Sequence, residues 1–164
     1  MRYLPVPAGY GLAVSRSTVT IMGETHAKEL TDALATATGN RLKPRPWQGA
    51  PSMRFRGVKD SRKSLFGLEY PVCLGGDKKG CGTHRILIIE GDAPLLVGLT
   101  TLKTLDCLQD YDRDRLWAPC FQKWLPLSLA PGDTQCHMLP IFDFPSDSTP
   151  HFPPCHPRDH KLSQ

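Results

Sequence analysis

The sequence has no apolar run long enough to cross a bilayer, because a spanning helix needs about 18 to 20 consecutive apolar residues. Pro5 and Pro7 interrupt the N-terminal stretch where a secretory signal would carry its apolar region. The six cysteines include no Cys-x-x-Cys pair. We therefore expect a cytoplasmic chain with reduced thiols and no membrane partner.

No charge of one sign dominates, since the formal net charge is only +4 over 164 residues. Basic residues cluster at 41–45, 54–63 and 78–85, which we interpret as solvated surface. The sequence has none of the interleaved aromatic and basic residues that are typical of RNA-recognition motifs. We therefore do not expect a nucleic-acid partner.

The length suffices for one domain with its own core. The 16 prolines gather mainly at residues 1–10, 44–51 and 119–157, where they favour loops because proline fixes φ and removes a backbone donor. We expect an irregular lead-in over residues 1–10, a single domain over 11–144 and a disordered proline- and histidine-rich tail over 145–164.

The densest apolar stretch begins at Ile86. Residues 86–89 form a short continuous apolar run, which predicts a strand buried on both faces. A second such strand, residues 95–97, ends at Gly98. Leucines then recur at helical spacing over residues 99–105, which predicts a short helix packed on the sheet.

Upstream, residues 11–14 and 18–22 read as strands, and residues 24–38 as a helix that stops at Gly39-Asn40. The predicted buried face of this helix consists of Ala27, Leu30, Leu34 and Ala37, and His26 is expected at the surface. A projecting hairpin is predicted from residues 53–57 and 65–74, joined by a polar turn and followed by a flexible turn over 75–83. Three weaker strands are predicted at residues 107–110, 124–129 and 136–142.

The order of these segments resembles one half of a retropepsin-like aspartic protease, the protease domain of retroviral and retrotransposon polyproteins. Leu96-Val97-Gly98 resembles the second hydrophobic-hydrophobic-Gly element of that family, and Ile21-Met22-Gly23 resembles the segment after its catalytic turn. The resemblance implies a mainly β fold, a small closed barrel with a flap hairpin and one or two short helices. It also implies that a substrate would lie against Phe55, Arg56, Gly57, Leu96, Val97 and Gly98.

The chemistry of this family needs an Asp-Thr/Ser-Gly motif in each half. The two carboxyl groups face each other across a dimer axis and share one proton, because two carboxyl groups that close together cannot both ionise. Counting back from Gly23, the motif falls on Val14, Ser15 and Arg16. No Asp or Glu precedes Glu24, so shifting the alignment by a few residues does not restore a carboxylate. We therefore expect no catalytic aspartate and no aspartic-endopeptidase activity.

Two functions remain open at this point. The chain is either a protease-like domain of a retrotransposon polyprotein that has lost its activity, or a non-catalytic module that keeps the cleft and flap to bind a peptide. In both cases the resemblance implies a peptide or polyprotein segment as partner, and a tendency to form a homodimer.

Metal and thiol sites are not expected. Zinc sites use Cys and His at short spacing, whereas seven residues separate Cys73 from Cys81. The cluster of His151, Cys155, His156 and His160 lies in proline-rich sequence with no element to fix it. Cys136 and His137 would point to opposite faces of a strand, so they do not form a nucleophile and base. We expect no cofactor.

Overall fold

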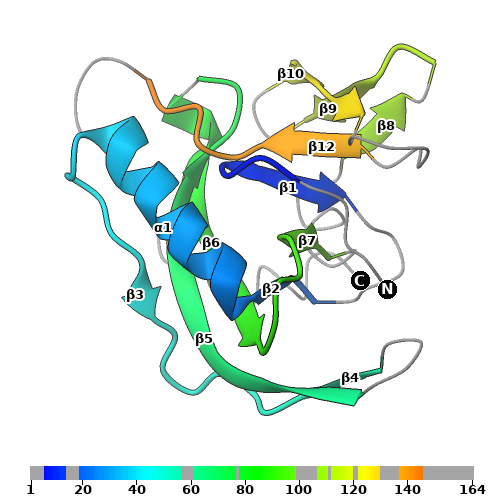
Figure 1. The fold of residues 1–164 in the computed structure, drawn as a ribbon. Coiled ribbons are helices and arrows are strands. Elements are labelled where there is room, and N and C mark those ends of the chain that lie inside the picture. Colours follow the sequence, from blue (N-terminus) through cyan, green and yellow to red (C-terminus); the bar gives the residue numbers. More distant parts are fainter. Residues whose placement is uncertain are drawn as a thin grey trace.

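The computed structural model describes residues 6–13, 19–56, 61–76, 78–98, 107–110, 112–119, 122–129 and 137–145. The predicted helix over residues 99–105 and the predicted tail from residue 146 lie outside these ranges. Within them the fold is mainly β, with one α-helix and two sheets (Figure 1). No helix in the described ranges is long and apolar enough to cross a membrane.

The larger sheet has nine strands, in the order β11-β12-β1-β7-β2-β6-β5-β3, with β4 paired to β5 outside this path. The strands are β1 (Tyr10–Ala13), β2 (Ile21–Gly23), β3 (Arg45–Pro46), β4 (Arg54–Arg56), β5 (Ser61–Cys73), β6 (Cys81–Ile89), β7 (Leu96–Val97), β11 (Ser128–Leu129) and β12 (His137–Pro140). Strands β11 and β3 stand at opposite ends of this order. Among the described strands the sheet is therefore open, and the expected closed barrel is not confirmed.

Strand β6 lies in the middle of the fold, between β2 and β5. Its residues Ile86 to Ile89 are 0 to 2% exposed, which confirms the predicted strand buried on both faces. The strand begins at Cys81, earlier than the sequence indicated, because the polar residues 81–85 pair with β5. Backbone pairing thus extends the strand beyond its apolar run.

Helix α1 (Glu24–Thr38) has the predicted bounds, and Gly39 ends it in the left-handed region at φ 59°. Figure 1 shows the helix lying along the side of the sheet formed by β5 and β6. His26 was expected at the surface but is only 6% exposed. It lies one helical turn before the buried Leu30 and so faces the core with it. Thr38 rather than Ala37 completes the buried face.

A smaller, three-stranded sheet has the order β10-β9-β8, from β8 (Leu108–Asp110), β9 (Arg115–Ala118) and β10 (Lys123–Pro126). The buried side chain of His137 connects it to β12. The Gln109 amide lies 2.7 Å from His137 Nδ1, and His137 Nε2 lies 2.9 Å from the Asp114 carboxylate. With Nδ1 accepting and Nε2–H donating, both ring nitrogens hold the two sheets together.

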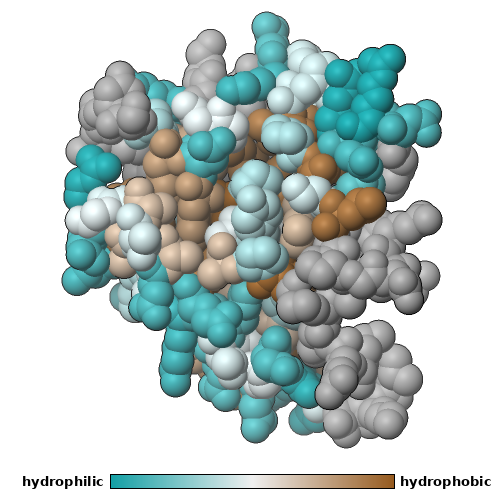
Figure 2. All heavy atoms as spheres, turned by 45° about the horizontal axis from the view of Figure 1, so that its top comes forward, coloured by the Kyte–Doolittle hydropathy of each residue, from teal (hydrophilic) through white to brown (hydrophobic). Residues whose placement is uncertain are grey.

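The space-filling view shows where apolar side chains reach the described surface. In Figure 2 hydrophobic residues gather toward the middle of the face, with hydrophilic residues around them. The large side chains with the most exposure lie on several strands: Leu65, Phe66, Leu108, Trp124 and Leu129. The exposed apolar surface is therefore distributed over both sheets.

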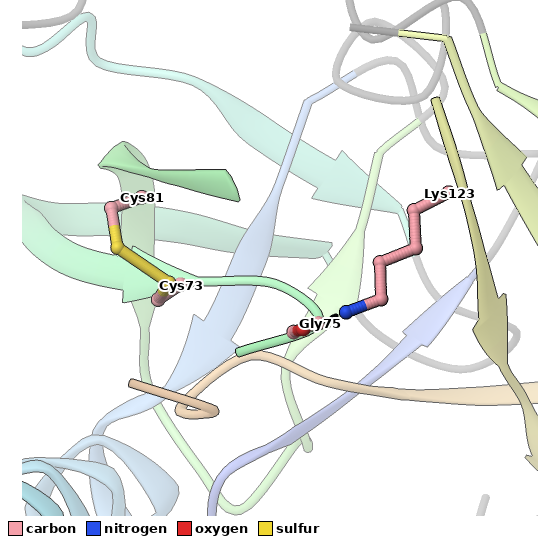
Figure 3. The surroundings of a disulfide bond; sticks show 4 residues. All are labelled: Cys73, Gly75, Cys81 and Lys123. Atoms are coloured by element: carbon pink, nitrogen blue, oxygen red, sulfur yellow. Dashed lines mark hydrogen bonds between the residues drawn. A yellow bond between two sulfur atoms is a disulfide. The ribbon is translucent and has the colours of Figure 1, made fainter. Parts of the chain in front are cut away.

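The expectation of reduced thiols is wrong for one pair, because Cys73 and Cys81 form a disulfide (Figure 3). The antiparallel register of β5 and β6 places them directly opposite each other, with their Cα atoms 4.0 Å apart. In the turn between them, the carbonyl of Gly75 accepts a hydrogen bond from the Lys123 ammonium group of β10. The disulfide therefore closes the β5–β6 hairpin next to the point where its turn contacts the smaller sheet.

Replacing both Cys73 and Cys81 with alanine should lower the free energy of unfolding by about 2 to 3 kcal/mol, because the unfolded chain is no longer closed into a short loop. Urea denaturation of the oxidised wild type, the reduced wild type and the variant measures this. The reduced wild type should resemble the variant. Equal midpoints for the variant and the oxidised wild type would contradict the expectation.

The stability of the fold should also depend on the protonation of His26. Burial lowers its pKa from the ordinary 6.5, while the Glu29 carboxylate opposes this shift. The unfolded chain therefore takes up the proton first as the pH falls, and stability is lost below about pH 6.5. The melting temperature should fall less between about pH 7.5 and about pH 5.5 in His26→Leu than in the wild type. An identical fall in both proteins would refute the assignment.

Candidate functional site

The segment at the motif position joins β1 to β2. Val14, Ser15 and Arg16 lie outside the described residues, but the residues on both sides of the segment, Ala13 and Val19, are described. Strand β7 pairs with both neighbours, with Leu96 in register with Leu12 of β1 and with Ile21 of β2. Strand β7 thus lies between the two strands that this segment connects.

Gly98 follows β7 directly and lies against Val19 and Thr20, the residues that lead into β2. Its backbone N–H donates to Thr20 Oγ1 at 3.0 Å, and the same hydroxyl lies 3.0 Å from His84 Nε2. A Cβ atom at position 98 would lie only 2.5 Å from the carbonyl carbon of Val19. This close approach of two backbones requires glycine.

The two strands of the predicted hairpin are present. Strand β4 pairs with the first residues of β5, with Arg54 opposite Lys63 and Phe55 opposite Arg62. The second strand begins at Ser61, four residues before the predicted start, and the connecting residues 57–60 lie outside the described ranges. In Figure 1 the hairpin lies at the bottom of the view and projects from the larger sheet, whereas the three-stranded sheet lies at the top.

Arg62 anchors the hairpin to the turn after β6. Its Nη1 donates to the carbonyl of Glu90 at 2.7 Å. Gly91 makes room for this contact, because a Cβ atom there would overlap the Arg62 guanidinium group. The base of the hairpin is therefore fixed to the body of the domain.

An apolar cluster, called here the hairpin cluster, lies between the hairpin and the sheet. Its buried members are Ile21, Leu87, Ile89 and Ala93, and its partly buried members are Val19, Trp47, Ala50, Met53, Phe55 and Leu96. The structure thus brings together Phe55 and Leu96, two predicted site residues from distant parts of the chain. Both side chains are only partly buried, so apolar surface of the cluster remains exposed.

The other predicted site residues lie elsewhere. Val97 is 4% exposed and packs in the main core, and Gly98 is buried against Val19. The backbone of Arg56 pairs with Ser61, while Gly57 is outside the described residues. Sequence reasoning did not include Trp47 and Met53. They lie in or next to a proline-rich basic loop and carry no local signal that they belong to this cluster.

The strands around the motif position, β1, β2 and β7, carry no Asp or Glu. No group of three or more metal-binding side chains occurs within the ranges that the structure describes. Two histidine–carboxylate pairs occur among the described residues, His26 with Glu29 on α1 and His137 with Asp114. The second pair connects the two sheets, and Gln109 occupies the other nitrogen of His137. Neither pair lies on β1, β2 or β7.

No protein-family profile matches the sequence, and no curated protein matches it. Among solved structures, the chain is similar to the retroviral protease-like domain of Ddi1 from Leishmania major. The sequences are 19% identical and the TM-score is 0.47, with 79% of this chain and 100% of that chain covered.

Alanine at position 98 should destabilise the junction of β1, β2 and β7 by about 1 to 3 kcal/mol, because the new methyl group meets backbone atoms that cannot move aside easily. Gly82→Ala is a matched control, since a Cβ atom there has no other atom within 4 Å. Thermal unfolding of the two variants compares them. Equal melting temperatures would contradict the close contact between Gly98 and Val19.

Proposed function

We propose that this chain is an aspartic-protease-like domain derived from a retrotransposon polyprotein that binds an extended peptide without hydrolysing it. The hairpin cluster is the observation that carries the proposal, because Phe55 of β4 and Leu96 of β7 both pack against it with part of their surface exposed. The resemblance of the sequence to retropepsins supports the class of domain.

The proposed lack of hydrolysis rests on the sequence around position 14. The family mechanism uses one carboxylate as a base on water and another as an acid. The first 23 residues contain no carboxylate, and Arg16 stands where the tight turn needs glycine. Loss of one general acid or base costs about 10²- to 10⁴-fold in rate. A symmetric homodimer, which we include in the proposal, would lose both copies.

Peptide binding rests on the geometry of the hairpin. Among the described strands, β4 pairs with β5 and with no other, so its outer edge is available to an extended chain. Strand addition would provide backbone hydrogen bonds, while alternate side chains of the peptide would reach the hairpin cluster. The Arg62–Glu90 contact holds the base of the hairpin in place for this.

Purified protein should therefore bind members of a library of extended apolar peptides and release no pepstatin-sensitive cleavage products. Fluorescence anisotropy measures binding, and mass spectrometry detects cleavage. Phe55→Ser should weaken binding about tenfold or more, since a buried Phe contributes about 1.5 to 3 kcal/mol. Leu129→Ser is the control, because Leu129 is 52% exposed on β11 and is not a member of the hairpin cluster.

Two results would overturn the proposal. Pepstatin-sensitive cleavage would show that the chain has catalytic groups that the sequence does not indicate. A wild type that binds no peptide, or equal losses in Phe55→Ser and Leu129→Ser, would exclude the hairpin cluster as the binding surface. Thermal unfolding of both variants verifies that each remains folded.

A further inference from the structure

A pocket lies between the loop that follows α1 and the sheet. Its volume is about 460 Å³, within the size range of small-ligand sites. Its lining includes Arg41, Lys43 and Arg45 from the loop and β3, with Glu69 of β5 and Thr83 of β6. Arg45 and Glu69 lie opposite each other in the pairing of β3 with β5. None of these residues belongs to the hairpin cluster.

The three basic side chains of this pocket are not neutralised. None of them lies within 4.0 Å of a carboxylate among the described residues, and all three are exposed. Arg41 uses its Nε to donate to the Thr38 carbonyl at 2.8 Å, which orients the guanidinium group and leaves its terminal N–H groups available. The loop therefore presents three positive charges within five residues.

The one acid in the pocket already has a cation beside it. Arg85 Nε lies 4.0 Å from the Glu69 carboxylate, and the Arg85 guanidinium group stacks over Trp47 at 5.3 Å from the ring centre. Glu69 is thus balanced by a residue that does not line the pocket. The pocket itself keeps a net positive charge that favours an anion.

The backbone of the loop cannot serve as the recognition edge. Trp47 N–H donates to the Gly67 carbonyl at 3.0 Å, so strand alternation turns residues 45 and 47 toward β5 and residues 44 and 46 away from it. Pro44 and Pro46 have no N–H to offer on that outer side. A peptide strand therefore cannot add here, and the side chains must recognise the ligand.

We propose that this pocket binds a small phosphate-bearing anion. The planar guanidinium groups of Arg41 and Arg45 match phosphate oxygens with paired N–H donors, and Lys43 adds a compact positive charge. A ligand with more than one negative charge interacts with all three cations at once. This site is independent of the proposed peptide-binding surface.

Isothermal titration calorimetry of the full chain with inorganic pyrophosphate at low salt tests the proposal. One pyrophosphate should bind per chain, and Arg41→Gln/Arg45→Gln should weaken binding at least about tenfold, as expected for charged hydrogen bonds. The matched control is Arg54→Gln/Lys63→Gln, which removes the same charge from an exposed pair on the hairpin. It should leave the affinity within about twofold.

The failures are distinguishable. No binding of pyrophosphate would overturn the proposal. Equal weakening in the two double variants would show only diffuse attraction to a basic surface and would overturn it as well. Tighter binding of a short single-stranded oligonucleotide that the control variant also weakens would assign the charge to nucleic acid instead. Thermal unfolding without ligand verifies that both variants are folded. None of these results bears on peptide binding at the hairpin cluster.

Discussion

Burial of β6 on both of its faces is the constraint on which the other parts of the fold depend. Alternation along the strand sends Ile86 and Ile88 into the main core, and Leu87 and Ile89 into the hairpin cluster. Each buried side chain of this kind contributes about 1.5 to 3 kcal/mol. The proposed peptide surface thus shares a strand with the core that packs against α1. A substitution that displaces residues 86–89 therefore disturbs both the core and the proposed peptide surface.

The sequence predicted the elements whose signal is local. Helix α1 has its predicted bounds because its apolar spacing and the glycine at position 39 act together. The apolar run of β6 identified a strand buried on both faces. The start of that strand, and the whole of β3, depend instead on pairing with β5. Polar residues and a proline gave no periodicity from which either could be recognised.

Contacts between distant residues were the ones that the sequence could not predict. The Cys73–Cys81 disulfide follows from the register of β5 and β6, whereas the spacing alone suggested two separate thiols. The hydrogen bonds of His137 reach across two sheets, and its partners lie more than twenty residues away. For the candidate site, Phe55 and Leu96 were identified from a family resemblance, but their neighbours Trp47 and Met53 were not.

The pairing of β1 has a consequence for the order in which the chain can fold during synthesis. This first strand lies between β7 and β12, with Leu12 in register with Leu96 and Tyr10 with Pro140. It therefore leaves the ribosome long before either partner exists. The β5–β6 hairpin and α1 can form earlier, because their partners are near in sequence. Strand β1 must therefore remain unpaired until β7 has been translated, and its other edge must wait for β12.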